Sequence, residues 1–196
     1  MTVREYGYEY DAVRDEELFR ESKGKTAHGS LWGSLCLRSG RDALKIIANE
    51  HSGCAVFMPA LSCDSMVLPF ETYGCKVNFY RLREDYSADI SHVDDLLAGS
   101  SSEAVFLYMD YFGKRSVSDE ELNGLKKRNP KLVFVEDRTH NLIREQYHKF
   151  VPDYTIASLR KWLAVPDGGI FISERDICGT EFSNDTEFYT RRLSAQ

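Results

Sequence analysis

The sequence has no long hydrophobic run and no excess of positive charge. No stretch of about 18 apolar residues occurs, so we do not expect a membrane-spanning segment. The 25 lysines and arginines are outnumbered by 31 aspartates and glutamates, which gives a net charge of −6. Because nucleic-acid phosphates are bound by basic surfaces, this balance argues against a nucleic-acid-binding protein. The first residues, MTVREYGYEYDAV, are charged and aromatic, and we do not expect them to act as a secretory signal.

Paired cysteines are also lacking. The five cysteines form no C-x-x-C pair, and the five histidines are scattered along the chain. An odd number of unpaired cysteines argues against a disulfide framework, and the absence of ligand spacing argues against a zinc site. We therefore expect reduced thiols in a cytoplasmic protein with no metal site.

What the sequence does contain is a regular alternation of short apolar runs and amphipathic segments. Strands are expected at 54–60, 75–82, 103–110, 131–137, 153–158 and 168–174. Helices are expected at 40–50, 62–74, 91–99 and 118–130, with Ser91 as the cap of the third. The apolar runs are continuous, which is typical of strands that are buried on both faces. The pattern predicts a three-layer α/β/α fold with a mostly parallel central sheet.

The last strand is expected to break this parallel order. The connection from Ser158 to Gly168 is too short for a crossover helix, so this strand is predicted to be antiparallel. Residues 1–34 are polar and read as an amino-terminal arm, with a short helix expected near 15–21. We find no domain boundary between residues 35 and 175, so residues 35–196 are expected to form one domain.

Polar residues gather where the predicted strands end. In open α/β sheets, ligands bind outside the carboxyl ends of the strands. Asp110, Asp137, Ser158 and Lys161 all stand at such ends. The loop at 38–44, RSGRDAL, opens a helix with a serine and a glycine, and the free N–H groups at such a start can hold a phosphate.

A lysine near an acid at a sheet edge suits a carbonyl cofactor. Lysine can form a Schiff base with an aldehyde. Pyridoxal phosphate needs such a lysine, a carboxylate for its ring nitrogen and a cradle for its phosphate. Lys161 and Asp137 would fill the first two roles, and Lys161 would also carry a proton. Ser39, Gly40 and Ser158 would bind the phosphate.

Between residues 35 and 175 the chain resembles the fold type I pyridoxal-phosphate enzymes, and among them the DegT/StrS-type sugar aminotransferases. The resemblance rests on SGRDAL, VFMPALSCDSMVLPFETYGCKVNFY, YMDYFG, VEDRTHNLI and SLRKWLAVPDGG, in the order of the family. It implies an aminotransferase large domain at 35–196. It also implies Asp137 at the pyridine nitrogen, His140 at the ring or its oxygen, and Lys161 as the Schiff-base lysine. Ser158 and the turn Ser39-Gly40-Arg41 correspond to the phosphate ligands.

The chain departs from the family at three candidate cofactor-binding positions and in length. The stretch that usually supplies a ring-stacking aromatic offers only Ser62 or Cys63. Asp110 stands where the family often has histidine, and Arg41 replaces a small residue. Members of the family are longer and add a carboxyl-terminal small domain. The chain is therefore a fragment, a natural minimal form or a degenerate relative.

The resemblance implies a homodimeric aminotransferase that acts on small molecules. The expected donor is an amino acid, glutamate or glutamine, and the expected acceptor is the keto group of a nucleotide-linked sugar. One alternative is a truncated or degenerate domain that binds cofactor or a partner without turnover. A third reading is a flavodoxin-like phosphate binder that uses the loop at 39–41. Taken singly, Asp137 could cap a turn, Lys161 could be a surface lysine and His140 could be structural.

Overall fold

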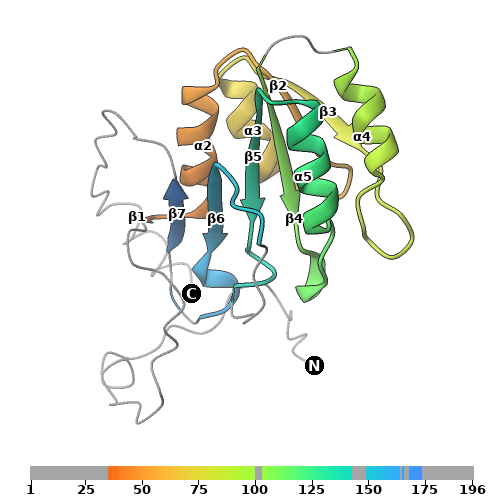
Figure 1. Cartoon of the computed structure of the whole chain (residues 1–196). Helices are drawn as coiled ribbons and strands as arrows, with labels where there is room; N and C mark the ends of the chain where they lie inside the picture. The colour runs from red at the N-terminus through yellow and green to blue at the C-terminus, as the bar shows by residue number, and fades with distance from the viewer. Residues whose placement is uncertain (1–34, 100–102, 143–148, 164, 166–167, 174–196) are drawn as a thin grey trace, which may run out of the picture.

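The described part of the chain forms a seven-stranded sheet. A computed structural model describes residues 35–99, 103–142, 149–163, 165 and 168–173. The strands are β1 (Leu35–Leu37), β2 (Ala55–Pro59), β3 (Lys76–Tyr80), β4 (Ala104–Met109), β5 (Leu132–Asp137), β6 (Tyr154–Ser158) and β7 (Gly169–Ser173). Their order across the sheet is β1-β7-β6-β5-β4-β2-β3 (Figure 1).

The sheet is parallel except at one strand. β3, β2, β4, β5 and β6 pair in parallel. β7 runs antiparallel to both of its neighbours, β6 and β1, so β1 has the direction of the parallel strands. The expected fold class is confirmed, and so is the antiparallel last strand. The short connection between β6 and β7 leaves no room for a crossover helix, which is why the direction reverses there.

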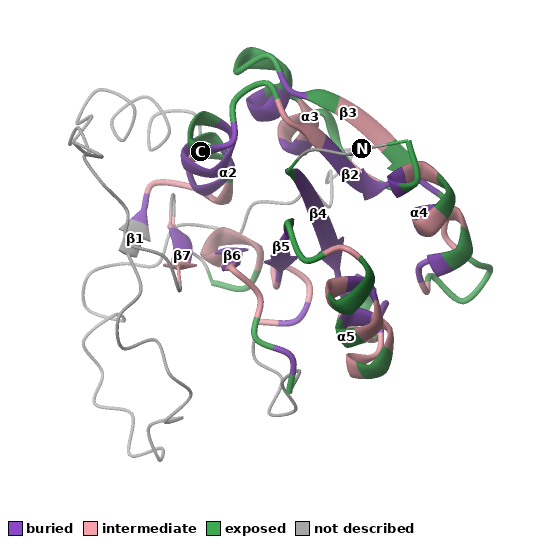
Figure 2. Ribbon diagram, turned by 45° about the horizontal axis from the view of Figure 1, so that its top comes forward, coloured by how far each residue is buried: buried purple, intermediate pink, exposed green. Residues whose placement is uncertain are grey.

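Helices cover both faces of the sheet, as Figures 1 and 2 show. α2 (Gly40–Glu50) and α3 (Asp64–Thr72) pack on one face, and α4 (Ile90–Leu97) and α5 (Asp119–Arg128) pack on the other. Alternate strand residues enter the two layers: Val56 and Met58 face α2 and α3, whereas Phe57 belongs to the opposite core. Every residue of β4 and β5 is buried, which explains their continuous apolar runs.

Side-chain caps fix where the helices begin. Ser39 caps α2, and Ser118 caps α5 in a capping box with Glu121. The expected cap of α4 is wrong. The cap is Asp89, whose carboxylate accepts a hydrogen bond from the His92 N–H at 3.3 Å, while Ser91 lies inside the helix and donates its hydroxyl to Asp89. Both residues suit a cap, and the chain uses the earlier one.

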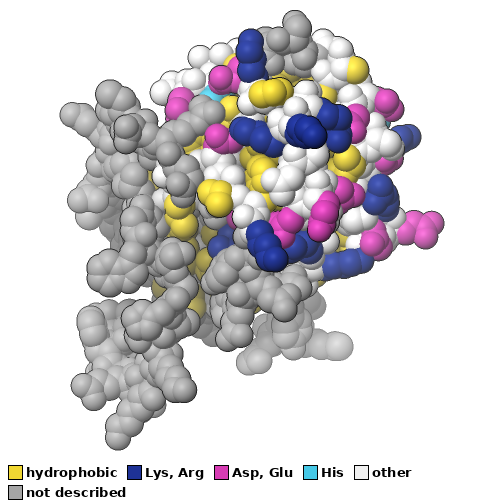
Figure 3. All heavy atoms as spheres, in the orientation of Figure 1, with side chains coloured by type: hydrophobic (Ala, Val, Ile, Leu, Met, Phe, Trp, Pro, Cys, Tyr) yellow, Lys and Arg dark blue, Asp and Glu magenta, His cyan; other side chains and the backbone are white. Residues whose placement is uncertain are grey.

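Several expectations concern residues outside the described ranges. These are the arm at 1–34 with its short helix, Cys178 and the residues after 173. Within the described ranges Cys54, Cys63 and Cys75 are free thiols, and Cys63 is exposed. None of the helices in the described ranges is long and apolar enough to cross a membrane. On the face seen in Figure 3, basic and acidic side chains are interspersed, so this face carries no basic patch.

Candidate functional site

Six strands, β1 to β6, end at the same edge of the sheet, which we call the carboxyl edge. In Figure 1 the arrowheads of β4, β5 and β6 point to it. Two short 3-10 turns lie there, η1 (Tyr111–Gly113) after β4 and η2 (Leu159–Lys161) after β6. The predicted site residues all follow or end strands at this edge: Ser39, Gly40, Arg41, Cys63, Asp110, Asp137, His140, Ser158 and Lys161.

Asp137 is the last residue of β5, and its side chain is buried, with 5% of the residue exposed. Its Oδ1 accepts a hydrogen bond from the Thr139 N–H at 2.8 Å. Burial raises the pKa of Asp137, while the backbone and hydroxyl of Thr139 and the nearby His140 act in the opposite direction. A buried carboxylate whose pKa is raised in this way gains ionisation when a cation approaches it. The site therefore offers a strong partner for a protonated ring nitrogen.

His140 lies three residues beyond Asp137 and has an unsatisfied ring nitrogen. Burial lowers the pKa of His140, the Asp137 charge opposes this, and the positive charge of Lys161 adds to the lowering. The ring stacks on Phe112, with centroids 5.4 Å apart and planes 25° apart, and Tyr111 meets it edge-on. Its Nδ1 is buried and has no hydrogen-bond partner. Since buried polar atoms are normally paired, this nitrogen is suited to receive a ligand atom.

Lys161 ends η2 and is partly buried. Its positive charge is the smallest of the three causes that act on the pKa of His140. Asp137 ends β5, His140 follows it, and Lys161 follows the neighbouring strand β6, so the three residues lie at the same edge of the sheet.

The start of α2 lies against the end of β6. A Cβ atom added to Gly40 would meet the Ala157 carbonyl oxygen and the Ser158 Cβ at 3.5 Å. The Ser39 hydroxyl accepts from the Asp42 N–H at 3.3 Å and donates to the Asp42 carboxylate at 2.9 Å. Ser39 is therefore occupied as a helix cap. The N–H groups of Gly40 and Arg41, which precede the first helical hydrogen bond, remain for an anion.

An acidic residue in the first turn of α2, Asp42, bears on whether an anion can bind at the start of this helix. Burial acts to raise the pKa of Asp42, but hydrogen bonds from Ser39 and Arg38 and the charges of Arg38 and Lys45 lower it overall. The Asp42 carboxylate is therefore ionised, and it is paired with Arg38 at 3.3 Å and Lys45 at 3.5 Å. An anion at the helix start would meet a neutralised acid rather than an isolated negative charge.

The glycine pair 168–169 lets three segments meet beside the cradle. The Gly168 N–H donates to the Arg38 carbonyl at 2.8 Å, and the Gly168 carbonyl accepts from the Leu159 N–H at 2.9 Å. A Cβ atom on Gly169 would lie 2.4 Å from the backbone of Ser39. A side chain at this position would overlap the backbone that precedes α2. Gly168 and Gly169 therefore allow the segment before α2, the turn after β6 and the start of β7 to pack closely together.

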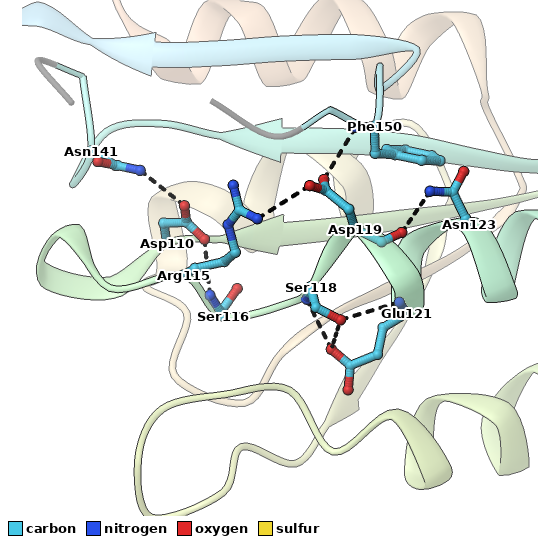
Figure 4. A network of polar contacts seen from close by, with 9 residues as sticks. All are labelled: Asp110, Arg115, Ser116, Ser118, Asp119, Glu121, Asn123, Asn141 and Phe150. Atoms are coloured by element: carbon cyan, nitrogen blue, oxygen red, sulfur yellow. Dashed lines mark hydrogen bonds and ion pairs between the residues drawn. The ribbon is translucent and has the colours of Figure 1, made fainter. Parts of the chain in front are cut away.

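Asp110 is tied into the loops that follow β4 and β5. One carboxylate oxygen accepts from the Ser116 N–H and the other from the Asn141 side-chain amide, both at 2.9 Å. Figure 4 shows Asp110 between these two residues, next to the Arg115–Asp119 ion pair at the start of α5. With 3% of the residue exposed, the carboxylate braces the loop that carries His140. Its contacts are those of a supporting residue.

Cys63 and Tyr111 come from the loops that follow β2 and β4. Cys63 caps α3 and is exposed, with its Sγ 3.0 Å from the Ser65 hydroxyl. Tyr111 donates its hydroxyl to the Leu61 carbonyl at 2.6 Å, and burial raises its pKa, with further contributions from Asp137 and Cys63. Tyr111 therefore fills the space between Asp137 and the loop after β2.

Sequence reasoning missed two residues that shape the site, Thr139 and Phe112. Thr139 contacts Asp137, Ser158 and Trp162. Phe112 has a left-handed backbone with φ of 52° and leaves 71% of the residue exposed while its ring covers His140. A non-glycine residue held in this conformation is uncommon and is a marker of functional loops. The sequence carries no local signal for either role.

Comparison with solved structures identifies the fold. No protein-family model matches the sequence, and no curated protein matches it. An archaeal alanine:glyoxylate aminotransferase is similar in structure, with a TM-score of 0.59, 18% identity and coverage of 74% of this chain and 41% of that one. A DegT/DnrJ/EryC1/StrS aminotransferase from Brucella abortus gives a TM-score of 0.55 at 18% identity, covering 82% of this chain and 44% of that one.

A third similar structure is a GDP-4-keto-6-deoxymannose-3-dehydratase with a trapped PLP-glutamate geminal diamine. Its TM-score is 0.59 at 18% identity, and the match covers 72% of this chain and 40% of that one. The chain has the fold of pyridoxal-phosphate aminotransferases of fold type I. It spans less than half the length of these three structures.

Proposed function

We propose that the chain forms the cofactor-binding part of a pyridoxal-phosphate-dependent aminotransferase. In this proposal an amino group moves from an amino-acid donor, glutamate or glutamine, to the keto group of a nucleotide-linked sugar. The fold supports the cofactor class, since its structural neighbours include aminotransferases and a structure with a trapped PLP-glutamate adduct. The choice of a sugar acceptor rests on the sequence resemblance to the DegT/StrS-type enzymes.

The observation that carries the proposal is the buried, unpartnered Nδ1 of His140 beside Asp137 and Lys161. A fold without a ligand here would leave this nitrogen unsatisfied at a cost of about 1–3 kcal/mol. The polar oxygen on the cofactor ring fits as its partner, because a neutral imidazole can donate or accept a hydrogen bond. The donor set of an acid, an imidazole and an amine also fits a pyridine aldehyde.

The residues of this chain would divide the work as follows. When bound, the cofactor supplies an electron-withdrawing ring that stabilises negative charge on the substrate carbon. Asp137 would hold the proton on the ring nitrogen, and its burial excludes water from that contact. Lys161 would bind the aldehyde carbon and, once displaced by the substrate amine, move a proton at the substrate carbon. The Gly40 and Arg41 N–H groups and Ser158 would hold the phosphate.

Three predicted cofactor-binding residues take lesser roles in this proposal. Asp110 supports the loop at 138–141 through Asn141. Arg41 contributes its backbone N–H, while its side chain is exposed. Cys63 stands at the loop after β2, near Tyr111, and would border the ring. The phosphate-only reading would use the start of α2 and leave Asp137 and Lys161 without a role.

Trapping the cofactor on the chain tests the proposal. Incubation with pyridoxal phosphate followed by borohydride should attach one cofactor to the peptide that contains Lys161. Lys161→Ala should abolish the adduct, and the matched control Lys131→Ala, at an exposed turn before β5, should keep it. A wild-type chain without an adduct at saturating cofactor would refute the proposal. An adduct that gives no 2-oxoglutarate from glutamate would favour the alternative of a domain that binds without turnover.

A further inference from the structure

Thr139 connects three parts of the candidate site that lie far apart in the sequence. The residue follows β5 and lies between Asp137 and His140. Its N–H donates to the Asp137 carboxylate at 2.8 Å, which closes the turn after the strand. This first contact is local. The other two contacts reach residues 19 and 23 positions away along the chain.

The hydroxyl of Thr139 lies between Asp137, whose pKa it helps to lower, and Ser158 on the phosphate side of the site. Its Oγ1 accepts a hydrogen bond from the Ser158 N–H at 3.2 Å. Ser158 ends β6, and its Cβ lies 3.5 Å from where a Cβ of Gly40 would be. The hydroxyl therefore links the turn after β5 to the segment that touches the start of α2. Removing it would free the Ser158 backbone beside the proposed anion cradle.

The carbonyl of Thr139 faces the lysine side. It accepts a hydrogen bond from the indole N–H of Trp162, which follows Lys161 and closes η2. Trp162 is 37% exposed, so this ring is not held in place by burial in a core. The bond to Thr139 is a polar contact that ties the end of the lysine turn to the segment after β5.

We propose that Thr139 is a positioning residue that fixes the acid, phosphate and lysine sides of the site relative to one another. Its hydroxyl sets the place of Ser158, and its carbonyl sets the place of the turn that carries Lys161. This inference rests on the proposed function, because the roles of Ser158 and Lys161 come from it. A threonine that merely stabilised the turn after β5 would affect all ligands alike.

The effect of the cofactor phosphate on binding distinguishes a Thr139 that positions the site from one that only stabilises the turn after β5. Dissociation constants would be measured by absorbance for pyridoxal phosphate and for pyridoxal, which lacks the phosphate, with wild type, Thr139→Val and Thr139→Ser. Valine has the shape of threonine and keeps both backbone hydrogen bonds, whereas serine keeps the hydroxyl. Because the hydroxyl also bonds Asp137, we expect Thr139→Val to weaken binding of both aldehydes, and to weaken pyridoxal phosphate at least fivefold more than pyridoxal. Thr139→Ser should behave as wild type for both.

The carbonyl contact is tested through its donor. Trp162→Phe keeps an aromatic ring and removes the indole N–H, so it should slow borohydride-trappable attachment to Lys161 with both aldehydes by a similar factor. Tyr73→Phe, at the exposed C-cap of α3, serves as the matched control and should change neither rate. A Trp162→Phe chain with wild-type rates would overturn the lysine-side role.

The outcomes distinguish the inference from the proposed function. If wild type binds neither aldehyde, the proposed function fails and the role of Thr139 fails with it. If wild type binds both, but Thr139→Val weakens them equally or weakens neither, only the role of Thr139 is refuted. Thermal unfolding of each variant without ligand shows whether the chain is folded, and Thr139→Ser then provides the comparison should Thr139→Val unfold.

Discussion

The two edges of the sheet each hold a histidine, and their ring nitrogens are satisfied differently. At the amino edge, where the parallel strands begin, His51 is 3% exposed, with Nδ1 2.6 Å from Glu103 and Nε2 3.1 Å from the Tyr154 hydroxyl. At the carboxyl edge, the Nδ1 of His140 is buried without a partner. Buried polar groups are normally paired. The fold alone satisfies both ring nitrogens of His51, whereas it leaves the Nδ1 of His140 for the ligand that we propose.

Two glycines, one near each edge of the sheet, also differ in the reason why glycine is needed there. Gly53 near the amino edge has φ of 76° and open space around it, so its role is a turn conformation. Gly169 at the carboxyl edge has no such φ, but a Cβ there would lie 2.4 Å from the Ser39 backbone. Gly53 therefore serves a turn, whereas Gly169 brings the start of α2 against β7.

Alanine at the two glycines should give the largest contrast. Gly169→Ala forces backbone segments apart and should cost about 3 kcal/mol of unfolding free energy, with loss of cofactor binding. Gly53→Ala should cost about 1 kcal/mol, the price of a left-handed residue, and leave the cofactor dissociation constant unchanged. Urea unfolding and absorbance titration measure the two effects. Equal destabilisation by both substitutions would remove the distinction between the edges.

Phenylalanine at the two histidines should separate stability from binding. His51→Phe removes two hydrogen bonds, one of them to a carboxylate, and should lower the unfolding free energy by about 2 kcal/mol. It should leave cofactor binding intact. His140→Phe keeps an aromatic ring beside Phe112, so it should change stability by less than about 1 kcal/mol and weaken binding about tenfold. Loss of cofactor binding in His51→Phe would contradict the assignment of His51 to stability and of His140 to binding.

The sequence predicted the carboxyl edge better than the contacts within it. Continuous apolar runs such as 104–109 and 132–137 gave the strands, and the residues that follow them placed Asp137 and Lys161 at one edge. The partners of Thr139 lie 19 and 23 residues away, so only the packed fold brings them together. The choice of Asp89 over Ser91 as a cap depends on hydrogen bonds between near-equivalent candidates. The stacking of Phe112 on His140 likewise depends on a backbone conformation that propensities do not favour.

Asp137→Asn should stabilise the chain without ligand, while under the proposed function it should slow amino transfer. Because burial raises the folded-state pKa of Asp137 above its ordinary value, the folded chain holds this proton more tightly than the unfolded chain. The stability that protonated Asp137 contributes is fully present below its ordinary pKa of about 4. This contribution is lost as the pH rises through the raised pKa of the folded chain. At pH 7 the asparagine variant should therefore be more stable by about 1 kcal/mol, and the difference should vanish at pH 3 to 4.

An exposed acid with the opposite shift provides the control. Hydrogen bonds from Ser87, together with Lys114, lower the pKa of Asp85, so its contribution is present at neutral pH and lost as the pH falls. Asp85→Asn should lower the melting temperature slightly at pH 7 and leave it unchanged in acid. Melting curves of both variants between pH 3 and 7 check the signs. An Asp137→Asn chain that is less stable at pH 7 and keeps full turnover would show that the buried carboxylate neither destabilises the fold nor serves the proposed reaction.

The smallest expected effect concerns the ring that covers His140. Phe112 is 71% exposed, so Phe112→Leu should change the unfolding free energy by less than about 1 kcal/mol, within the worth of one aromatic pair. It should also open His140 to water. Burial is the largest cause of the lowered pKa of His140, so the pKa should rise toward its ordinary value when the ring is removed. NMR titration of the imidazole measures this, with Phe79→Leu, an exposed ring on β3, as the control that should leave the titration unchanged. A pKa of His140 that stays low in Phe112→Leu would mean that the charge of Lys161, the second cause of the lowering, is the larger one. The stacked ring of Phe112 would then have no part in setting the charge of His140.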